Sequence, residues 1–509
     1  MSVRSPMQAI PRLAVVTWLC CFGFLHAHAE QPPHEFWLQL LDSEVPSVRL
    51  AGVVQIIQWA GSELTPDERM QGTRLLSKLA TLTNDANRDV RLASVRALGR
   101  MGIDGVTIVP CFRKAMESPD LEMRQTTTDA LLRYLMENAR LTQQSVGNLR
   151  PRLMSLFMQD AALFAPLIAM GLRDVDASVR WSAMSGLENA LQRTLTLFPS
   201  HTRNPTMVFS NKETRQKLFL WVQSWSELSR DLIPRVKHGK EAERLLAART
   251  LEILIDWTMD FDREYQAAGL QGHEKQEWMA HLRAIQEQLP DLVDGLPSDP
   301  IRIQLGVLAV LEAFNQYSHG VRGQVQPFLK SQQRFVRWSA LRVVSKWGAP
   351  RQGDEWQRVV QLLEDADQDV RQAASKTLLA WVADQEAATV GPAFVMKGEA
   401  MHGNMEASML LIIHPLMRIV SNAEPEQQEA ALATLGWLGR DAYPALHVCL
   451  RAMQTADPRI RRLVPDVLMK IAPRDQETGK ALEAALLDPD DQVKTAAAQA
   501  LLRWRDRQR

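Results

Sequence analysis

The sequence predicts an all-α protein, a right-handed α-solenoid (superhelix) of about ten or more helix–turn–helix repeats with a divergent helical insert in the middle. Two observations lead to this fold class. The chain has 509 residues, more than the roughly 250–300 that one hydrophobic core usually holds, so it needs several domains or a repeating array. One pattern of apolar and polar residues also recurs along it, at steps of 33 or 34 residues where it is clearest. This recurrence favours the array.

The recurring pattern is a helical stripe that ends in tryptophan. Counted from Val370, apolar or small side chains stand at offsets 0, 3, 4, 7, 8 and 11, and the last is Trp381. The same offsets counted from Val493 end at Trp504. This spacing places the side chains on one face of an α-helix and does not fit a strand. The first residue of each stripe is its anchor, and the other anchors are Val48, Val90, Met123, Val179, Ile303, Val336, Gln427 and Ile460.

Each anchor is followed by a basic or amide side chain and preceded by a turn. The residues after the anchors are Arg49, Arg91, Arg124, Arg180, Gln304, Arg337, Arg371, Gln428, Arg461 and Lys494. Six positions before these stand Ser43, Asp85, Ser118, Asp174, Ser298, Ser331, Asp365, Asn422, Thr455 and Asp488. Short side chains with an oxygen satisfy free backbone amides at tight turns and helix starts. A further striped helix precedes each turn, and Pro110, Pro166 and Pro290 are expected to start or bend it. Neither helix can bury its stripe alone, so neighbouring units must stack.

These features resemble HEAT repeats, which belong to the armadillo-like superhelices, and the short units also resemble the HEAT-like repeats of phycobilin lyases. The resemblance covers about two-thirds of the chain after residue 29. It implies a hydrogen-bonded ladder along the stack, made by each turn acid and the basic residue that follows it. The implied ladder residues are Asp85 with Arg91, Asp174 with Arg180, Asp365 with Arg371, and Asp488 with Lys494.

The N-terminus has the pattern of a secretory signal peptide. Arg4 and Arg12 precede the apolar run Leu13 to Leu25, and a small-x-small site ends at Ala29. The run is shorter than the roughly 20 residues that a membrane-spanning helix needs. We expect cleavage after Ala29, a periplasmic or secreted protein, and no transmembrane segment after signal cleavage.

The spacing of the repeats also predicts the domain organisation. Residues 1–29 are the signal peptide and 30–190 are N-terminal HEAT-like repeats. Residues 191–272 show no readable turn pattern and are divergent helical repeats or an insert, two alternatives that the sequence leaves open. Further repeats are expected at 273–386, a loop-rich excursion with many Met and His residues at 387–417, and terminal repeats with a polar cap at 418–509.

The excursion carries the sharpest candidate for chemistry. Met401, His402, Met405 and Met409 supply thioether and imidazole groups, the ligands that suit copper(I). A Met-lined packing surface is the more common use of such residues. His273, Glu277 and His281 also follow a helical spacing, but a zinc ion could reach only two of them. We predict no cofactor, and copper or a tetrapyrrole, the latter by the lyase resemblance, remains the alternative.

The charge balance, the motifs and the cysteines exclude several classes of function. Lys and Arg number 59 and Asp and Glu 59, a balance that argues against a nucleic-acid partner. We find no catalytic motif of a hydrolase, nucleotide-binding or haem protein, and expect no enzyme. Cys111 and Cys449 are expected to be separate thiols because they lie in distant repeats.

Tryptophan positions suggest where a partner binds. Trp59, Trp347, Trp381 and Trp504 end their stripes and are expected in the core between repeats. Trp181 and Trp338 directly follow the basic position, so they are the candidates for partner binding. The sequence therefore predicts an exported scaffold that binds another protein through its concave surface and inserted loops.

Overall fold

A computed structural model describes residues 34–60, 72–102, 104–144, 149–195, 212–267, 273–350, 353–387 and 405–508. Every regular element among these residues is a helix, which confirms the prediction of an all-α repeat fold. The chain divides into two compact units, Met1–Lys275 and Gln276–Arg509. Residues 1–29, where the signal peptide is expected, lie outside the described residues.

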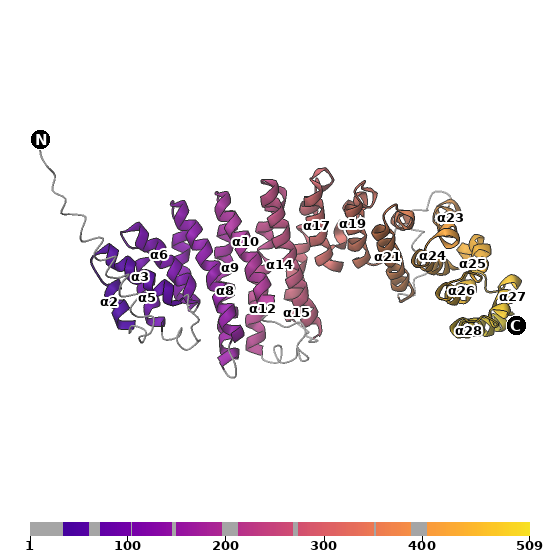
Figure 1. Cartoon of the computed structure of the whole chain (residues 1–509), viewed down its shortest axis with the longest axis horizontal. Helices are drawn as coiled ribbons and strands as arrows, with labels where there is room; N and C mark the ends of the chain where they lie inside the picture. Colours follow the sequence, from indigo (N-terminus) through magenta and orange to yellow (C-terminus); the bar gives the residue numbers. More distant parts are fainter. Residues whose placement is uncertain are drawn as a thin grey trace, which may run out of the picture. The chain divides into compact units, whose positions relative to one another are not determined.

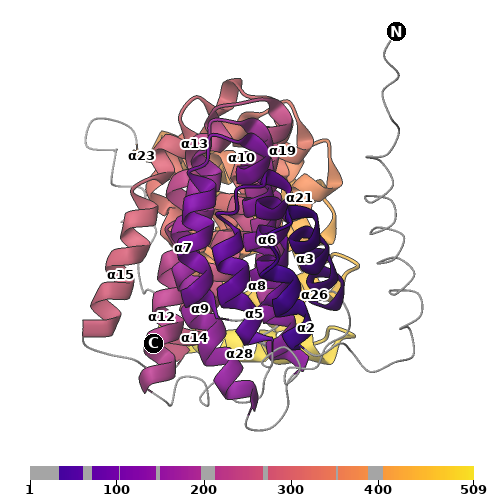
Figure 2. The same ribbon diagram turned by 90° about the vertical axis from the view of Figure 1, so that its left-hand side faces the viewer.

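The first unit is two layers of helices that alternate along the chain (Figure 1). One layer holds the first helix of each repeat: α2 (His34–Leu41), α5 (Thr73–Leu82), α7 (Gly105–Met116), α9 (Leu149–Arg173), and the pair α12 (Lys212–Ser226) and α13 (Ser229–Lys237). The other holds the second helices: α3 (Pro46–Ala60), α6 (Arg88–Met101), α8 (Leu121–Gln144), α10 (Ala177–Leu195) and α14 (Glu241–Ala267). Consecutive second helices contact each other from α3 to α14. In Figure 2, α7 and α9 lie on one side of this unit and α3 and α6 on the other.

The second unit repeats this plan with shorter first elements. These are α15 (His273–Gln286), which spans the unit boundary, with α16 (Leu289–Val293) and η1 (Leu296–Ser298), then η2 (Asn315–Val321), α18 (Arg322–Val325) and η3 (Gln326–Lys330), α20 (Gly353–Gln361) with η4 (Leu362–Glu364), α23 (Met405–Asn422), η6 (Gly439–Ala445) with α25 (Leu446–Ala452), and α27 (Gln476–Ala485). The second helices are α17 (Ile301–Ala313), α19 (Arg334–Lys346), α21 (Gln368–Ala387), α24 (Pro425–Leu438), α26 (Pro458–Ile471) and α28 (Asp491–Gln508). Each of these contacts the next from α17 to α28.

The anchors are buried between the helices, except Val48, which is partly exposed. All ten lie near the start of a second helix, and Val90, Val179, Val336, Val370 and Val493 are fully buried. The turn residues act as expected from their chemistry, because the Asp365 carboxylate accepts from the amide of Asp367 at 3.0 Å. Equivalent turn bonds are made by Ser43, Asp85, Ser118, Asp174, Ser331 and Asp488.

The region 191–272 contains one further helical pair in its described part. Helix α14 contacts α13 and the preceding second helix α10, as every other second helix of this unit contacts its neighbours. Of the two alternatives left open by the sequence, the described helices have the arrangement of a repeat. The stripe was unreadable because the charged Glu243 stands at the anchor position, where the other repeats carry an apolar side chain or, once, Gln427.

The expected loop-rich excursion at 387–417 is shorter in the structure. Residues 388–404 lie outside the described residues, but α23 begins at Met405, so 405–417 is helical and the prediction of a loop there is wrong. The physical reason is an apolar stripe of Ile412, Ile413, Leu416, Ile419 and Val420, all buried. The loop was expected because of Gly391, Pro392, Gly398 and Gly403, and all four precede this helix.

One described helix is long and apolar enough to cross a membrane by length and composition. It is the stretch Met154–Arg173 of α9, with a mean hydropathy of 1.5, and 61% of that stretch is buried inside the protein. Helix α9 contacts α7, α8, α10 and α12. Its apolar character is therefore accounted for by packing within the first unit.

Candidate functional site

Ion pairs that are largely shielded from water join several of the consecutive repeats in each unit, and we call them the ladder. In each pair, the turn carboxylate binds the arginine of the preceding repeat, and the shorter of the two nitrogen–oxygen distances lies between 2.7 and 2.8 Å in Arg49–Asp85, Arg124–Asp174, Arg337–Asp365 and Arg461–Asp488. The prediction that each acid binds the arginine after it is wrong for the side chains. Arg91 Nη1 donates instead to the backbone carbonyl oxygens of Asp85 and Ala86, at 2.8 and 3.0 Å.

The predicted ladder residues therefore have two different roles. Arg371 closes its own turn through carbonyl oxygens, as Arg91 does, and Lys494 pairs with Asp491 at 2.7 Å rather than with Asp488. Arginines that reach the next repeat do both, because Arg337 also donates to the Ser331 carbonyl oxygen at 2.8 Å. The planar guanidinium allows this, since it presents donors in two directions.

The ladder is electrostatically strong because its members are shielded from water. The Arg461 side chain is 11% exposed and that of Asp488 is 9% exposed. The Arg461 guanidinium holds the pKa of the Asp488 carboxyl below its usual value, and Arg49 does the same for Asp85. Two parallel N–H donors on one carboxylate fix the geometry as well as the charge. These residues join repeats and have little surface left for a partner.

Glu243 adds another pair to the ladder at a place where the sequence pattern fails. Arg180 Nε donates to its carboxylate at 2.5 Å, and Glu243 is buried, although it lies in α14 rather than in a turn. Arg244 beside it donates to the Val236 carbonyl oxygen at 2.6 Å, as other ladder arginines donate to their own turns. The one signal available in the sequence was Arg244 itself, since the turn before it carries His238 in place of an acid.

The first unit also holds a buried polar cluster that the sequence did not indicate. Asp160 of α9 is 4% exposed and accepts from Tyr134 Oη at 2.6 Å, from the Gly105 amide at 3.2 Å and from Asn138 Nδ2 at 3.3 Å. Burial nevertheless raises the pKa of the Asp160 carboxyl. The cluster joins α7, α8 and α9 and has no open side, so it is structural.

The open face of the second helices is the surface left for binding. In α19, the buried residues Val336, Ala340 and Val343 define the inner side. Residues Arg334, Trp338 and Arg342 follow each other at four-residue steps on the opposite side. Arg342 stacks over the Trp338 ring at 4.5 Å and binds Glu312 of α17 at 2.6 Å. The arginine is thereby fixed over the ring by a neighbouring repeat.

A second pairing of the same kind lies at the start of α19. Arg334 stacks over the Phe335 ring at 4.4 Å and binds Asp367, just before α21, at 2.7 Å. Phe335 remains 53% exposed. Helix α19 thus presents two aromatic rings, each covered by an arginine that is held by an acid of an adjacent repeat. We call Phe335, Trp338, Arg334 and Arg342 the α19 surface.

The tryptophans that end the stripes lie in or against the core, unlike Trp181. Trp59, Trp347 and Trp381 are buried, and Trp504 packs against a cluster that includes Leu482 and Leu501. Trp181, on the equivalent position of α10, is 45% exposed. Trp181 and Trp338 therefore lie in different units, each at the same position of a second helix.

Some of the candidate metal ligands lie within the described residues and some lie outside them. Met401 and His402 lie outside the described residues, while Met405 and Met409 lie at the start of α23. His281 is 7% exposed and packs against Trp278 at 5.4 Å, and His273 and Glu277 are exposed on the same helix. Within the described ranges, no group of three or more His, Cys, Asp or Glu residues could hold a metal ion. Cys111 and Cys449 are both free thiols.

The stacked helical hairpins, the buried inter-repeat ladder and the open second-helix face define a helical repeat protein of the solenoid class. Comparison with protein families makes this more specific: a family model described as HEAT repeats matches residues 413–502, from α23 to α28. The chain is thus a helical repeat protein that carries HEAT repeats over this segment.

Other comparisons add less. No curated protein matches the sequence. Among solved structures, a crystal structure of an engineered protein is similar over 92% of this chain and 98% of that chain, with 14% identity and a TM-score of 0.35. At that TM-score, the likeness adds nothing to the fold described above.

Proposed function

We propose that the protein is an exported scaffold that binds a partner protein through the open face of its second helices. The observation that carries the proposal is the α19 surface, where Trp338 and Phe335 are each paired with an arginine. Tryptophan, tyrosine and arginine dominate the binding energy of protein interfaces. A stacked array also holds these side chains in place before binding, so little ordering cost is added when a partner docks. The proposal is for binding and assigns no reaction.

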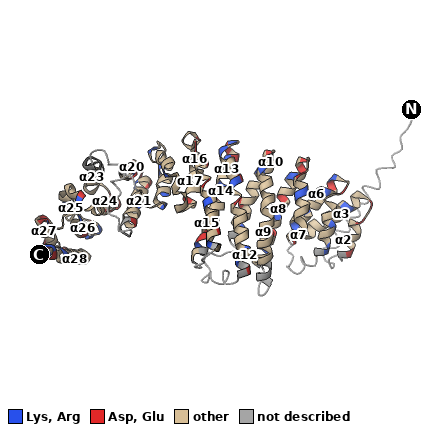
Figure 3. Ribbon diagram, turned by 180° about the vertical axis from the view of Figure 1, so that it is seen from behind, with Lys and Arg blue, Asp and Glu red and all other residues tan. Residues whose placement is uncertain are grey.

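The arginine–acid pairs favour a protein surface without strong net charge as the partner, rather than a strongly charged molecule. Arg342 and Arg334 are already neutralised by Glu312 and Asp367. Basic and acidic side chains are interspersed along the described helices of each unit (Figure 3). A surface of this kind offers flat aromatic and guanidinium faces rather than net charge, and such faces are buried at the centre of protein interfaces.

Site-specific cross-linking in the native host tests the proposal. A photoreactive benzoyl-phenylalanine replaces Trp338 in one variant and Arg451, an exposed residue of α25 in the first-helix layer, in a matched control. We expect one distinct adduct from position 338 that is absent from position 451. Identical adducts from both positions, or none from 338, would refute the α19 surface as the binding site.

Affinity for the captured partner gives a quantitative check. Trp338→Ala should weaken binding by about 2 kcal/mol or more, roughly 30-fold in Kd, because it removes a central aromatic anchor. Tyr443→Ala is the control, since Tyr443 is an aromatic residue of the second unit, 53% exposed, that lies in the first-helix layer. An equal loss in both variants would point to a general effect on the fold.

Export is a separate part of the proposal and rests on the N-terminal sequence pattern. Intact mass measurement of the protein purified from the periplasm or medium should give a chain that starts at Glu30. Recovery of the full-length chain from the cytoplasm alone would remove the export step and leave the scaffold proposal standing.

A further inference from the structure

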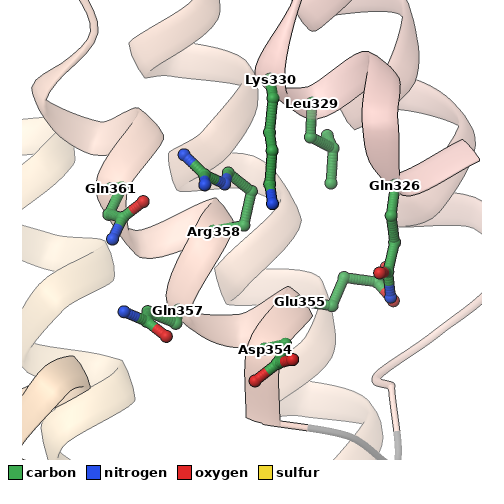
Figure 4. A pocket seen from close by; sticks show the side chains of 8 residues that line it. All are labelled: Gln326, Leu329, Lys330, Asp354, Glu355, Gln357, Arg358 and Gln361. Atoms are coloured by element: carbon green, nitrogen blue, oxygen red, sulfur yellow. The ribbon is translucent and has the colours of Figure 1, made fainter.

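A polar pocket lies in the second unit, between η3 and α20 (Figure 4). These elements belong to the first-helix layer of two consecutive repeats, so the pocket is distinct from the α19 surface. Its volume is about 230 Å³. This is below the roughly 300–1,000 Å³ of pockets for drug-sized ligands, so a ligand the size of an amino acid fits.

The wall of the pocket is fixed by a buried ion pair. Glu355 is 2% exposed and accepts from Arg322 Nε at 2.9 Å. Arg322 also donates to the Gly348 carbonyl oxygen at 2.6 Å and lies 5.8 Å from the rings of both Trp347 and Trp381. Arg322 neutralises the charge of Glu355, so Glu355 adds no net charge to the pocket.

Two cations on the pocket have no partner in the described part of the chain. Lys330, at the end of η3, and Arg358, in the middle of α20, line the pocket, and neither makes an ion pair or side-chain hydrogen bond with any described residue. This sets them apart from Arg322, Arg334 and Arg337, which are all paired with acids. Figure 4 shows Lys330 and Arg358 on one side of the opening and Asp354 on the other.

The lining residues select among anions. Among the described lining residues, the two unpaired cations and the carboxylate of Asp354, which pairs with none of them, leave an excess of one positive charge. Phosphate and a carboxylate would both be attracted to the cations and repelled by Asp354, but only a ligand with an ammonium or amide group beside its anion can also bind Asp354 or the neighbouring glutamine amides. Arginine binds carboxylates through two parallel hydrogen bonds. Gln357 and Gln361 add amide groups that both donate and accept, as the peptide-like part of a ligand requires.

We propose that this pocket binds the carboxylate of an amino acid or of a peptide end, with Lys330 and Arg358 on the carboxylate. Asp354 then faces the other end of the ligand. In a free amino acid that end is an ammonium group, which Asp354 attracts. In a peptide C-terminus it is an uncharged amide, which Asp354 does not attract. The two sources share the carboxylate and differ in their dependence on Asp354.

Titration calorimetry on the chain from residue 30 to 509 tests the pocket with three probes: L-glutamate, acetyl-glycyl-glycine and inorganic phosphate. We expect one of the two carboxylate probes to bind, and phosphate to bind more weakly. Lys330→Gln and Arg358→Gln should each weaken that binding about tenfold or more. Lys376→Gln and Arg451→Gln, exposed cations of the same unit outside the pocket, should not change it. Thermal melting of all four variants verifies that they fold.

Asp354→Asn distinguishes the source of the carboxylate. It should weaken L-glutamate binding several-fold if the ligand is a free amino acid, and should leave acetyl-glycyl-glycine binding equal or stronger if it is a peptide end. Three results would overturn the proposal: neither carboxylate probe binds at 20 mM, phosphate binds more tightly than both, or the pocket variants bind as the wild type does. Cross-linking at position 338 is unaffected by any of these results, so this pocket and the partner surface fail separately.

Discussion

Two glycines at the same position of different repeats should respond oppositely to alanine. Gly99 in α6 lies nine residues after the anchor Val90, and Gly436 in α24 lies nine residues after the anchor Gln427. A Cβ atom built on Gly99 would lie 2.4 Å from the Ala130 carbonyl oxygen and 2.7 Å from its Cα. These atoms are backbone of the next second helix, α8, so they cannot rotate away.

The same atom on Gly436 has more room. Its nearest neighbours would be Val467 Cγ2 at 3.3 Å and Lys470 Cδ at 3.6 Å, both side-chain atoms of α26. A Gly-to-Ala change in a helix gains up to about 1 kcal/mol from propensity. Overpacking a tight contact costs about 1–3 kcal/mol. We therefore expect Gly99→Ala to destabilise the first unit by about 1–2 kcal/mol, and Gly436→Ala to lie between no change and a gain of about 1 kcal/mol in the second unit.

Hydrogen exchange measured by mass spectrometry is the suitable assay, because a repeat array need not unfold in one step and exchange reports each helix separately. Peptides from α6 and α8 should exchange about five- to thirty-fold faster in Gly99→Ala, the equivalent of about 1–2 kcal/mol. Peptides from α24 and α26 should exchange at the wild-type rate or more slowly in Gly436→Ala. Unchanged exchange across α6 and α8 in Gly99→Ala would refute the close-contact argument.

Three further predictions follow from buried charges and thiols. Asp365→Ala should lower the unfolding free energy by about 3 kcal/mol, because it leaves the Arg337 guanidinium buried without its partner, and a double-mutant cycle with Arg337→Met in urea should recover much of that loss. Burial raises the pKa of Asp160, so its folded pKa lies above the unfolded value of about 3.9. The contribution of Asp160 to stability is complete below about pH 4 and is lost as the pH rises through the folded pKa. The stability of Asp160→Asn relative to wild type should therefore increase between pH 4 and pH 7. A difference in urea midpoint that stays constant over this range would contradict the argument. Burial raises the pKa of the Cys449 thiol to about 12. Iodoacetamide at pH 8 should therefore label Cys449 only after unfolding, which mass spectrometry can measure. Rapid labelling of the native protein would contradict the burial of this thiol.

The sequence was sufficient for the fold wherever core and turn chemistry coincide in one short segment. Around Val370, the apolar stripe, the turn acid Asp365 and the basic Arg371 all lie within a few residues, so one pattern reports the whole repeat. The pattern failed at α14, where the ladder acid moved into the helix as Glu243 and took the anchor position. A local pattern cannot detect an exchange of roles between the turn and the helix.

The binding features were harder to predict because they form between repeats. The position of Trp338 on the side of α19 opposite Val336 and Ala340 followed from its offset within one helix, but its pairing with Arg342 and Glu312 depends on how α17 stacks on α19. Lys330 and Arg358 are 28 residues apart in sequence and line the same pocket only because the first-layer elements η3 and α20 lie side by side. No spacing rule within one repeat brings such residues together.

The direction of the ladder shows why stability and binding do not compete for the same residues. The residue after the anchor, such as Arg337, extends along the stack to the next turn and is only 15% exposed. The next residue, Trp338, lies one further helical step of about 100° around α19 and is therefore turned away from the stack. A substitution at the first position breaks a joint between repeats, whereas one at the second changes only the open face. In α19 the ladder residue and the open-face residue are therefore neighbours in sequence with separate tasks, whereas in α6 the equivalent of Trp338 is Leu92, which is 4% exposed and belongs to the core.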